Sequence, residues 1–339
     1  MNRLEVRHLG TSFDTDEGRV HAVADVSFTI RAGATTALVG ESGSGKSVTG
    51  LTLMRLLPRA TRTQVGGQAL FVDRAGRTVN LLTLPEPRMR ALRGNEVAMI
   101  FQEPMTSLNP VFTVGEQIAE SLRLHRRLDR AAARAQALRL LELVEIPAAR
   151  QRQHEHPHQL SGGMRQRVMI ALAMACEPTL LIADEPTTAL DVTIQAQILA
   201  LMRRLQAETG MSMLFITHNL GVVAHHADDV AVMYAGRIVE AAPVRPLFAA
   251  PLHPYTQGLL ACLPGRAKGA GQARPKRLVA IRGQVSSPLA PPPGCAFQPR
   301  CDQARPACTQ AMPALAASGA GRLARCVLVP EAVASKEAA

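Results

Sequence analysis

Residues 40–47, GESGSGKS, combine three glycines with a lysine and a serine at a spacing that suits phosphate binding. In the pattern G-x-x-x-x-G-K-[ST], the glycines let the backbone wrap around phosphates with its amides pointing inward. Lys46 is expected to reach the β- and γ-phosphate oxygens, and Ser47 to ligate Mg²⁺. An apolar run precedes the loop and a helical pattern follows it, as this motif requires. We therefore predict a nucleoside triphosphate site formed by Gly40, Ser42, Gly43, Ser44, Gly45, Lys46 and Ser47.

A second motif, TLLIADEP at 179–186, places two acids at the end of an apolar run. Four apolar residues indicate a buried strand, and Asp184 at its carboxyl end is suited to the Mg²⁺ shell. Glu185, the next residue, is a candidate to polarise the attacking water. An acidic pair of this kind is weak evidence by itself, because many buried strands end in acids. Together with the glycine-rich loop it predicts nucleotide hydrolysis.

Two more polar residues follow apolar segments. Gln102 comes after VAMIF, and His218 comes after MLFIT. Ligands of open α/β sheets gather at the carboxyl ends of the strands. We therefore expect both side chains to lie where they can contact the γ-phosphate or its attacking water. Each residue alone would more often be a helix cap or a satisfied polar side chain.

Another anion-binding pattern, LSGG at 160–163, precedes the apolar run VMIALAMA. A capping serine, exposed backbone amides and the positive end of a helix dipole favour an anion there. The first loop already accounts for one face of a nucleotide. We therefore predict that Ser161, Gly162 and Gly163 close the γ-phosphate of a nucleotide held by a second copy, in a symmetric pair.

The remaining pattern predicts the elements that position these residues. Buried strands are expected at 35–40, 179–186 and 212–218, and a hairpin at 229–242 that turns at residues 235–237. Helices are expected from Lys46 to Pro58, over about 115–146 and over about 192–208. Strands that alternate with helices indicate a mainly parallel, helix-covered sheet. Residues from about 93 to 175 are interpreted as a helical insertion into the α/β core. The Pro-, Gly- and Ala-rich part after about 243 is interpreted as a separate C-terminal module or a loosely packed tail.

Composition narrows the function classes. Of the 339 residues, 38 are Lys or Arg and 27 are Asp or Glu, a net charge of +11. Such a charge favours a polyanionic or phosphate-bearing partner. The positive charge is spread along the chain, however, and with no Trp and 2 Tyr there is little to stack bases on, so nucleic acid is not predicted.

No stretch of the N-terminus has the apolar core of a signal peptide. The longest apolar run, 168–176, is shorter than the roughly 20 residues of a membrane span. A cytosolic protein with reduced cysteines is therefore expected.

The motifs, their order and their spacing resemble the nucleotide-binding subunits of ABC transporters over residues 4–245. In family terms GESGSGKS resembles Walker A, Gln102 the Q-loop glutamine, LSGGMRQR the signature motif and LLIADE Walker B. Residues 189–191, ALD, resemble the D-loop, and His218 the switch histidine. The resemblance further implies an aromatic residue that stacks on adenine, for which Phe13 is the candidate.

One branch of the family is most similar. Met164 stands where the wider family usually has Gln. With this residue, FQEPMTSLNP at 101–110 and HPYTQGLL at 253–260, the chain resembles the ATPase subunits of oligopeptide and dipeptide importers. That branch also includes importers of nickel and glutathione. The implied fold is a P-loop NTPase (RecA-like) α/β core with an antiparallel β-subdomain and an α-helical insertion, followed by a small Cys-containing C-terminal module. The implied domains are 1–245, with a helical subdomain over 93–175, and 246–339.

The resemblance also implies function and partners. The chain is expected to bind ATP and Mg²⁺, with Ser47, Gln102 and Asp184 around the ion, and to hydrolyse ATP with Glu185 and His218. The expected partners are a second ATPase subunit, two membrane permeases and, indirectly, an extracytoplasmic solute-binding protein. The expected location is peripheral, at the cytoplasmic face of the inner membrane. The transported solute, and whether the ATPase pair is made of identical subunits, are left open.

Four cysteines lie near the end of the chain, Cys295, Cys301, Cys308 and Cys326. Their gaps are longer than those of zinc ribbons, which makes zinc a poor match. Because the branch resembled carries a segment of this kind that can hold a [4Fe-4S] cluster, such a cluster is one interpretation. Zinc and the absence of any metal are the alternatives. Cys176 and Cys262 are interpreted as packing residues.

Two other functions stay open at this point. One is a soluble ABC ATPase that acts on nucleic acid; such proteins generally carry two cassettes or large zinc-bearing insertions. In the other, the C-terminal tail is the working part and the cassette regulates it.

Overall fold

The computed structural model describes residues 1–58, 62–103, 107–188, 190–263, 280–319 and 321–330. The chain forms two compact units, each built from several segments. The first unit comprises Met1–Glu5, Thr29–Thr35 and Ala69–Ile216; the second comprises Val6–Phe28, Thr36–Gln68 and Thr217–Ala339. Three predicted segments lie partly outside the described residues: the helical insertion at 104–106, the ALD motif at 189, and the C-terminal part at 264–279 and 331–339.

Parallel strands form the centre of the first unit. Strands β6 (Val97–Ile100), β7 (Leu180–Asp184) and β8 (Ser212–Thr217) lie in the order β8-β7-β6, with Ile100 opposite Ala183 and Asp184 opposite Ile216. Almost every residue of these strands is buried, as their continuous apolar runs predict for a sheet covered on both faces. The carboxyl ends of β6 and β7 therefore meet at one edge, where polar side chains follow.

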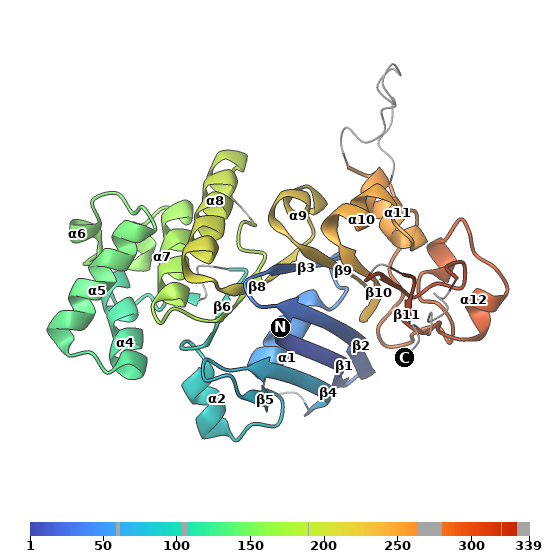
Figure 1. Ribbon diagram of the computed structural model, residues 1–339, viewed down its shortest axis with the longest axis horizontal. Coiled ribbons are helices and arrows are strands. Elements are labelled where there is room, and N and C mark those ends of the chain that lie inside the picture. The colour runs from blue at the N-terminus through green and yellow to red at the C-terminus, as the bar shows by residue number, and fades with distance from the viewer. Residues whose placement is uncertain (59–61, 104–106, 189, 264–279, 320, 331–339) are drawn as a thin grey trace, which may run out of the picture. The chain divides into compact units, whose positions relative to one another are not determined.

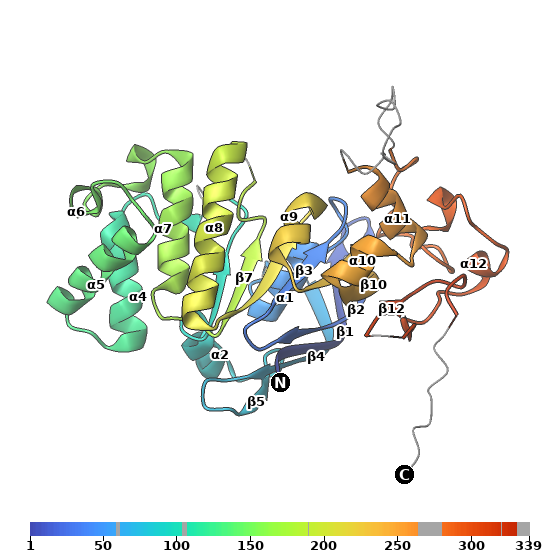
Figure 2. The ribbon, with the colours of Figure 1, turned by 45° about the horizontal axis from the view of Figure 1, so that its top comes forward.

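Helices of the first unit lie together in Figures 1 and 2. They are α4 (Val114–Arg126), α5 (Arg130–Leu143), α6 (Ala149–Arg152), α7 (Gly162–Met174) and α8 (Val192–Thr209). The single helix expected over 115–146 is wrong, because the chain breaks between α4 and α5. Arg127 adopts a left-handed φ of 55°, and the Asp129 side chain caps α5 by accepting from the Ala132 amide at 2.8 Å. The sequence signal for this break was Asp129 itself.

The rest of the first unit consists of shorter elements. These are α2 (Glu86–Leu92), β5 (Thr78–Asn80), the 3₁₀ turn η1 (Pro157–Gln159) and the end of β4 (Arg62–Val72). β5 pairs antiparallel with β4, with Phe71 opposite Val79. The sheet is therefore mixed. Of the strands before residue 97, only the one at 35–40 was predicted from the sequence.

The second unit contains long early strands and the late hairpin. β1 (Asn2–Thr15), β2 (Gly18–Arg31), β10 (Arg237–Pro243), β9 (Asp229–Tyr234) and β3 (Thr35–Val39) follow one another across the sheet. β9 and β10 form the predicted hairpin. Ala235 and Gly236, the two residues of its turn, have φ of 44° and 76°, which is typical of the type I′ turn that matches strand twist.

The helices of the second unit include α1 (Lys46–Met54), α9 (Leu220–His226), α10 (Val244–Ala249) and α11 (Pro254–Ala261). α1 ends earlier than Pro58, because Arg55 adopts a left-handed conformation and caps the helix. The C-terminal segment, which here means the chain from residue 246 onward and so includes α11, also contains η2 (Gln298–Arg300), α12 (Ala307–Gln310), β11 (Ala316–Ala317) and β12 (Leu323–Ala324). β12 pairs antiparallel with β10, so the end of the described chain joins the sheet of this unit.

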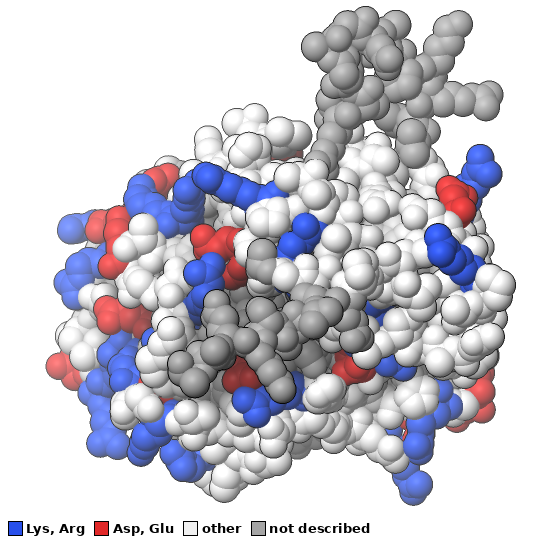
Figure 3. Space-filling model, turned by 45° about the vertical axis from the view of Figure 1, so that its right-hand side comes forward, with Lys and Arg blue, Asp and Glu red and all other residues white. Residues whose placement is uncertain are grey.

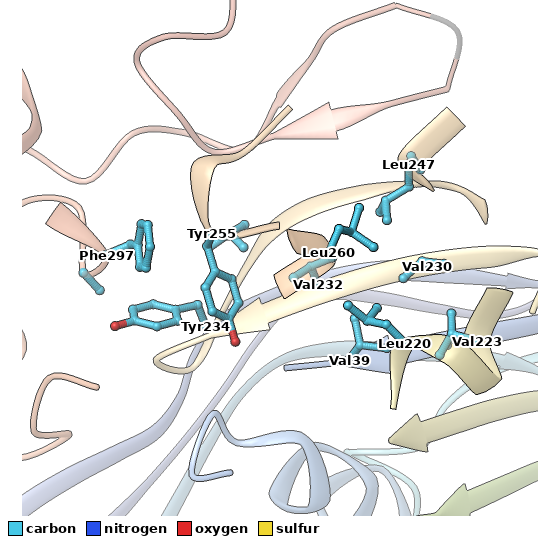
Figure 4. Packing of buried hydrophobic residues seen from close by; sticks show 14 residues of the cluster. Val39, Leu220, Val223, Val230, Val232, Tyr234, Leu247, Tyr255, Leu260 and Phe297 are labelled. Carbon is cyan, nitrogen blue, oxygen red and sulfur yellow. The ribbon is translucent and has the colours of Figure 1, made fainter. Parts of the chain in front are cut away.

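A hydrophobic cluster holds this C-terminal segment to the sheet (Figure 4). Val39 of β3, Val232 of β9 and Leu220 of α9 pack with Leu260 of α11 and with Phe297. Each of these side chains is less than a tenth exposed. Burying one such side chain contributes about 1.5–3 kcal/mol. The cluster therefore fixes the C-terminal segment firmly within the second unit.

Among the described residues, none of the helices is both long and apolar enough to span a bilayer. On the face shown in Figure 3, blue Lys and Arg side chains stand among red Asp and Glu side chains, with broad uncharged areas between them. This pattern agrees with the spread of basic residues along the sequence.

Candidate nucleotide site

The glycine-rich loop follows β3 in the second unit and leads into α1, whose first residue is Lys46. Gly45 caps this helix with a φ of 99°, a conformation that L side chains rarely adopt. A Cβ at this position would overlap the Ala22 carbonyl oxygen on β2. A glycine is therefore required here both by the backbone angle and by the approach of β2.

Hydrogen bonds within the loop itself fix the position of Lys46. Lys46 is 5% exposed, and its Nζ donates to the Gly40 carbonyl at 2.9 Å and to the Glu41 carbonyl at 3.0 Å. The Ser44 side chain is buried, and among the described residues its Oγ has no hydrogen-bond partner. The loop therefore has the features expected of a triphosphate site. These are the buried ammonium of Lys46, the Ser44 hydroxyl that can still form hydrogen bonds, and a backbone at Gly45 that leaves no room for a Cβ.

Beside this loop lies a cavity of about 500 Å³, within the range of small-molecule sites. Gly43 lines it, together with residues 10–12 of β1, 21–24 of β2 and 285–288 of the C-terminal segment. Phe13, the predicted adenine-stacking residue, is half-buried and follows Ser12 on β1, but it is not among the lining residues. Stacking of Phe13 on adenine stays a prediction.

In the first unit, the structure brings Gln102 and Glu185 together. Gln102 lies just beyond β6, and its Nε2 donates to Glu185 Oε2 at 3.3 Å. Thr188 donates its hydroxyl to the same oxygen at 2.8 Å. Asp184, the last residue of β7, is buried. The amide and two carboxylates thus follow neighbouring strand ends, which is the donor set suited to a hydrated divalent ion.

Glu185 has a strained backbone. Its φ is 45°, unusual for a residue with a Cβ, and its amide donates to the Ile216 carbonyl at 2.9 Å. Such conformations cost about 1–3 kcal/mol and persist where the surroundings fix them. The strain turns the carboxylate towards Gln102 and Thr188 rather than along the strand.

His218 follows β8 and belongs to the second unit, where it is exposed. The next residue, Asn219, caps α9 by accepting from the amides of Gly221 at 3.0 Å and Val222 at 3.3 Å. The alternative role considered for a polar residue at this strand end, a helix cap, is therefore carried by Asn219. His218 keeps its predicted role as a proposal.

The LSGG segment forms the predicted helix start in the first unit. Ser161 is the N-cap of α7, and its Oγ accepts from the Met164 amide at 3.3 Å. Ser161 and Gly162 are exposed, and Gly163 is half-buried. Of the ALD segment, Ala189 lies outside the described residues, and Asp191 caps α8 by accepting from the Ile194 amide at 2.9 Å.

The four late cysteines do not fit a metal. Among the described residues, no group of three or more His, Cys, Asp or Glu side chains is arranged to hold a metal ion. Burial raises the pKa of the Cys295, Cys301 and Cys326 thiols. Cys308 is buried and its carbonyl accepts from the Cys295 amide at 2.8 Å. The expected [4Fe-4S] cluster and the zinc alternative at Cys295, Cys301, Cys308 and Cys326 therefore have no support, and we derive no chemistry from them.

Sequence reasoning missed residues that surround the loop. Glu41, an unassigned position of GESGSGKS, is bound by Arg300 and Tyr255 of the C-terminal segment. No motif pointed to Arg300, and Tyr255 was noted only as part of HPYTQGLL. Thr188 was missed because a threonine three residues after a glutamate is not a recognisable sequence motif.

Comparison with known proteins identifies the family. The family model for ABC transporters matches residues 23–188, and that for the oligopeptide/dipeptide transporter C-terminal region matches residues 239–308. A protein of Brucella melitensis, named as a peptide import ATP-binding protein, is 53% identical over 325 residues, which are 96% of each chain. This chain belongs to the ATP-binding proteins of the ABC transporter family. The predicted resemblance to ABC ATPases is thus confirmed.

Two further relatives of this ABC ATPase agree. A peptide ABC transporter ATP-binding protein of Sinorhizobium fredii is 51% identical over 323 residues, 95% of this chain and 94% of that one. A glutathione import ATP-binding protein of Pectobacterium atrosepticum is 59% identical over 274 residues, which are 81% of this chain but 44% of the longer relative.

Solved structures confirm the fold of the ABC ATPase. The ATP-binding cassette MJ0796, solved as a dimer bound to ADP and Pi, aligns with a TM-score of 0.62 at 24% identity and covers 71% of this chain and 99% of its own. CbiO1 of Clostridium perfringens aligns with a TM-score of 0.57 at 26% identity, covering 74% and 91%. The predicted P-loop α/β fold is therefore correct.

Proposed function

We propose that this ABC ATPase hydrolyses ATP to energise the import of dipeptides, oligopeptides or related small solutes. One observation carries the proposal: the same chain matches both the ABC transporter family and the C-terminal region of oligopeptide/dipeptide transporters. Relatives named for peptide and glutathione import, which cover most of this chain, support it. The solute itself is chosen by other components, which leaves its identity open.

The proposed chemistry is phosphoryl transfer to water, in which positioning and charge stabilisation do most of the work. Loop amides and Lys46 would hold the β- and γ-phosphates, and Phe13 would stack on adenine. Glu185 would orient the water and accept its proton, and His218 would keep the γ-phosphate and the water in register. Ser47, Gln102 and Asp184 would hold Mg²⁺, which when bound neutralises phosphate charge.

A second copy, or a relative, would complete each site. The exposed start of α7, with Ser161, Gly162 and Gly163, would close the γ-phosphate of the neighbouring subunit's ATP. The solved dimers of a related cassette support a pair of this kind. The proposed domains are an ATPase domain over residues 1–245, with its helical part at 93–175, and a C-terminal domain over residues 246–339.

Two membrane permeases would receive the ATPase at the cytoplasmic face of the membrane, and an extracytoplasmic binding protein would deliver the solute to them. A pair of apolar side chains just before α4 supports docking near the helical part. Val111 is 72% exposed and Phe112 is 49% exposed. Neither the family matches nor the relatives support the nucleic-acid alternative, and no observation favours the C-terminal tail as the working part.

The test is co-purification of the tagged, full-length chain with its membrane fraction. We expect two hydrophobic permeases to co-purify, and the ATPase of the reconstituted complex to rise when a peptide-loaded binding protein is added. Phe112→Ser should weaken the association, whereas Val192→Ser, which removes an apolar side chain 82% exposed on α8, should not. Co-purification of nucleic acid without permeases would overturn the proposal.

A further inference from the structure

Glu41, the second residue of GESGSGKS, is bound through its amide, its carbonyl and its carboxylate. Its amide donates to Tyr255 Oη at 2.9 Å. Its carbonyl accepts from Lys46 Nζ at 3.0 Å and from the Ser44 amide at 3.2 Å. Its carboxylate accepts two bonds from Arg300, Nη1 to Oε2 at 2.9 Å and Nη2 to Oε1 at 3.2 Å. Two of these partners, Tyr255 and Arg300, come from the C-terminal segment.

Arg300 is itself fixed by contacts with three further residues. Its Nε donates to the Arg282 carbonyl at 2.8 Å, and Nη1 lies 3.3 Å from Tyr234 Oη. The guanidinium carbon lies 5.7 Å from the ring centre of Tyr234 and 5.9 Å from that of Phe297, within cation–π range. Its side chain is 5% exposed, so the ion pair with Glu41 is poorly screened. Burial opposes its charge, but the bonds to Glu41 and Tyr234 raise the pKa of Arg300 above its usual value.

Tyr255 is equally constrained. It lies on α11, is fully buried and packs edge-on against Tyr234, with ring centres 4.7 Å apart, and against Phe297 at 5.4 Å (Figure 4). His253, the N-cap of α11, accepts from the Tyr255 amide at 3.0 Å. The hydroxyl therefore meets the Glu41 amide at a place set by the packing of the C-terminal segment.

We propose that Arg300 and Tyr255 are positioning residues for the phosphate-binding loop, so that the affinity for ATP depends on the C-terminal segment. The two residues, with Glu41, form a clasp. It fixes the peptide on either side of Glu41, and with it the carbonyls on which Lys46 rests. A loop that is already ordered loses less conformational entropy when it binds phosphates. The inference depends on the proposed function of the loop as an ATP site.

The test compares two equally buried arginines of the same segment. Arg300→Met and Glu41→Gln each break the clasp. Arg325→Met is the control, because the Arg325 side chain is 6% exposed and its hydrogen bonds go to Asp25, at 2.7 Å, and to the Ile238 and Pro313 carbonyls, which are not part of the loop. For each full-length variant, the Kd of a fluorescent ATP analogue and the thermal unfolding midpoint are measured. We expect the clasp variants to bind about tenfold more weakly, while Arg325→Met binds as the wild type does but melts earlier.

The double variant Glu41→Gln/Arg300→Met should bind no more weakly than the weaker single variant, because both remove one interaction. Tyr255→Phe, which retains the packed ring, guards against misfolding and should weaken binding about threefold. Unchanged affinity in both Arg300→Met and Tyr255→Phe would overturn the clasp. So would an equal loss of affinity in Arg325→Met.

Lys46→Met separates this inference from the proposed function on which it depends. If Lys46→Met weakens binding while the clasp variants bind normally, the clasp alone is wrong. If Lys46→Met also binds normally, the ATP site assigned to the loop is wrong as well, and the clasp loses its role.

Discussion

Helices α1 and α7 both have glycines at their start, Gly45 just before α1 and Gly162 and Gly163 in the first turn of α7, yet the two helix starts differ. The start of α1 is enclosed: Gly45 caps it without a side chain, and Lys46 and Ser44 are buried. The start of α7 is open: Ser161 caps it, and both Ser161 and Gly162 are exposed. An enclosed helix end can hold an anion with its own chain, whereas an open one gains strength only when a partner excludes water. This difference supports the proposal that α1 binds the chain's own nucleotide and that α7 acts on the nucleotide of a second subunit.

The largest effect is expected from a variant that binds ATP but hydrolyses it slowly, so that the ATP-bound state accumulates. Glu185→Gln should retain ATP binding while turnover falls by about 10²–10⁴, a typical contribution of a general base. In the trapped state, a cysteine introduced by Ser161→Cys should be protected from thiol reagents. Glu208→Gln, an exposed glutamate on α8, is the control for turnover. Full labelling in the trapped state would show that the open end needs no partner, and unchanged turnover would remove Glu185 from the mechanism.

A second test concerns the support of the enclosed end. Burial lowers the pKa of His253, which precedes Tyr255, to about 4. An unfolded chain binds a proton at this histidine near pH 6.5 and the folded chain does not, so stability is full above that pH and falls towards pH 4. The expected loss between pH 7 and pH 4.5 is about 2–3 kcal/mol of unfolding free energy.

Denaturant titrations of the wild type and of His253→Asn across this range isolate the histidine. Asn retains an acceptor for the Tyr255 amide but does not titrate. The wild type should therefore lose more stability than the variant on acidification. Equal losses in the two proteins would show that His253 is not the group responsible.

The third test removes the charge of the enclosed end. Lys46→Met keeps the stem of the buried side chain but loses the ammonium, and charged hydrogen bonds of this kind are worth about 1.5–3 kcal/mol. ATP affinity should fall about 10- to 100-fold in equilibrium binding. Arg203→Met, which removes an exposed positive charge from α8, is the control for loss of charge and should bind normally. A normal affinity in Lys46→Met would leave the enclosed end without its proposed ligand.

The smallest expected effect comes from mixing. Lys46→Met and Ser161→Arg should each be inactive alone, but an equal mixture should recover roughly a quarter of wild-type ATPase, because half the pairs carry one intact composite site out of two. Activity that stays at zero would contradict a composite site between copies of this chain. Recovery at high protein concentration and loss on dilution would support it.

The contrast also shows what the sequence could predict. Local signals sufficed for the loop, for the Ser161 cap and for the turn at Ala235, because each depends on backbone chemistry within a few residues. The interaction of Glu41 with Arg300 joins positions 259 apart, and no local pattern encodes such a pair. The cysteines mislead for a similar reason, since their spacing shows neither burial nor thiol orientation. Asp129 is a residue type that often caps a helix, but the apolar pattern continues on both sides of it and favoured a single helix.

The left-handed backbone at Glu185 sets stability against activity at a single position. Glycine adopts that conformation without steric cost, so Glu185→Gly should unfold at a higher temperature than Glu185→Gln, although neither hydrolyses ATP efficiently. Comparing the two melting temperatures measures the difference. Selection for heat resistance alone would discard the carboxylate. Its presence at a strained backbone position is what we expect if Glu185 has the role in turnover that we propose for it.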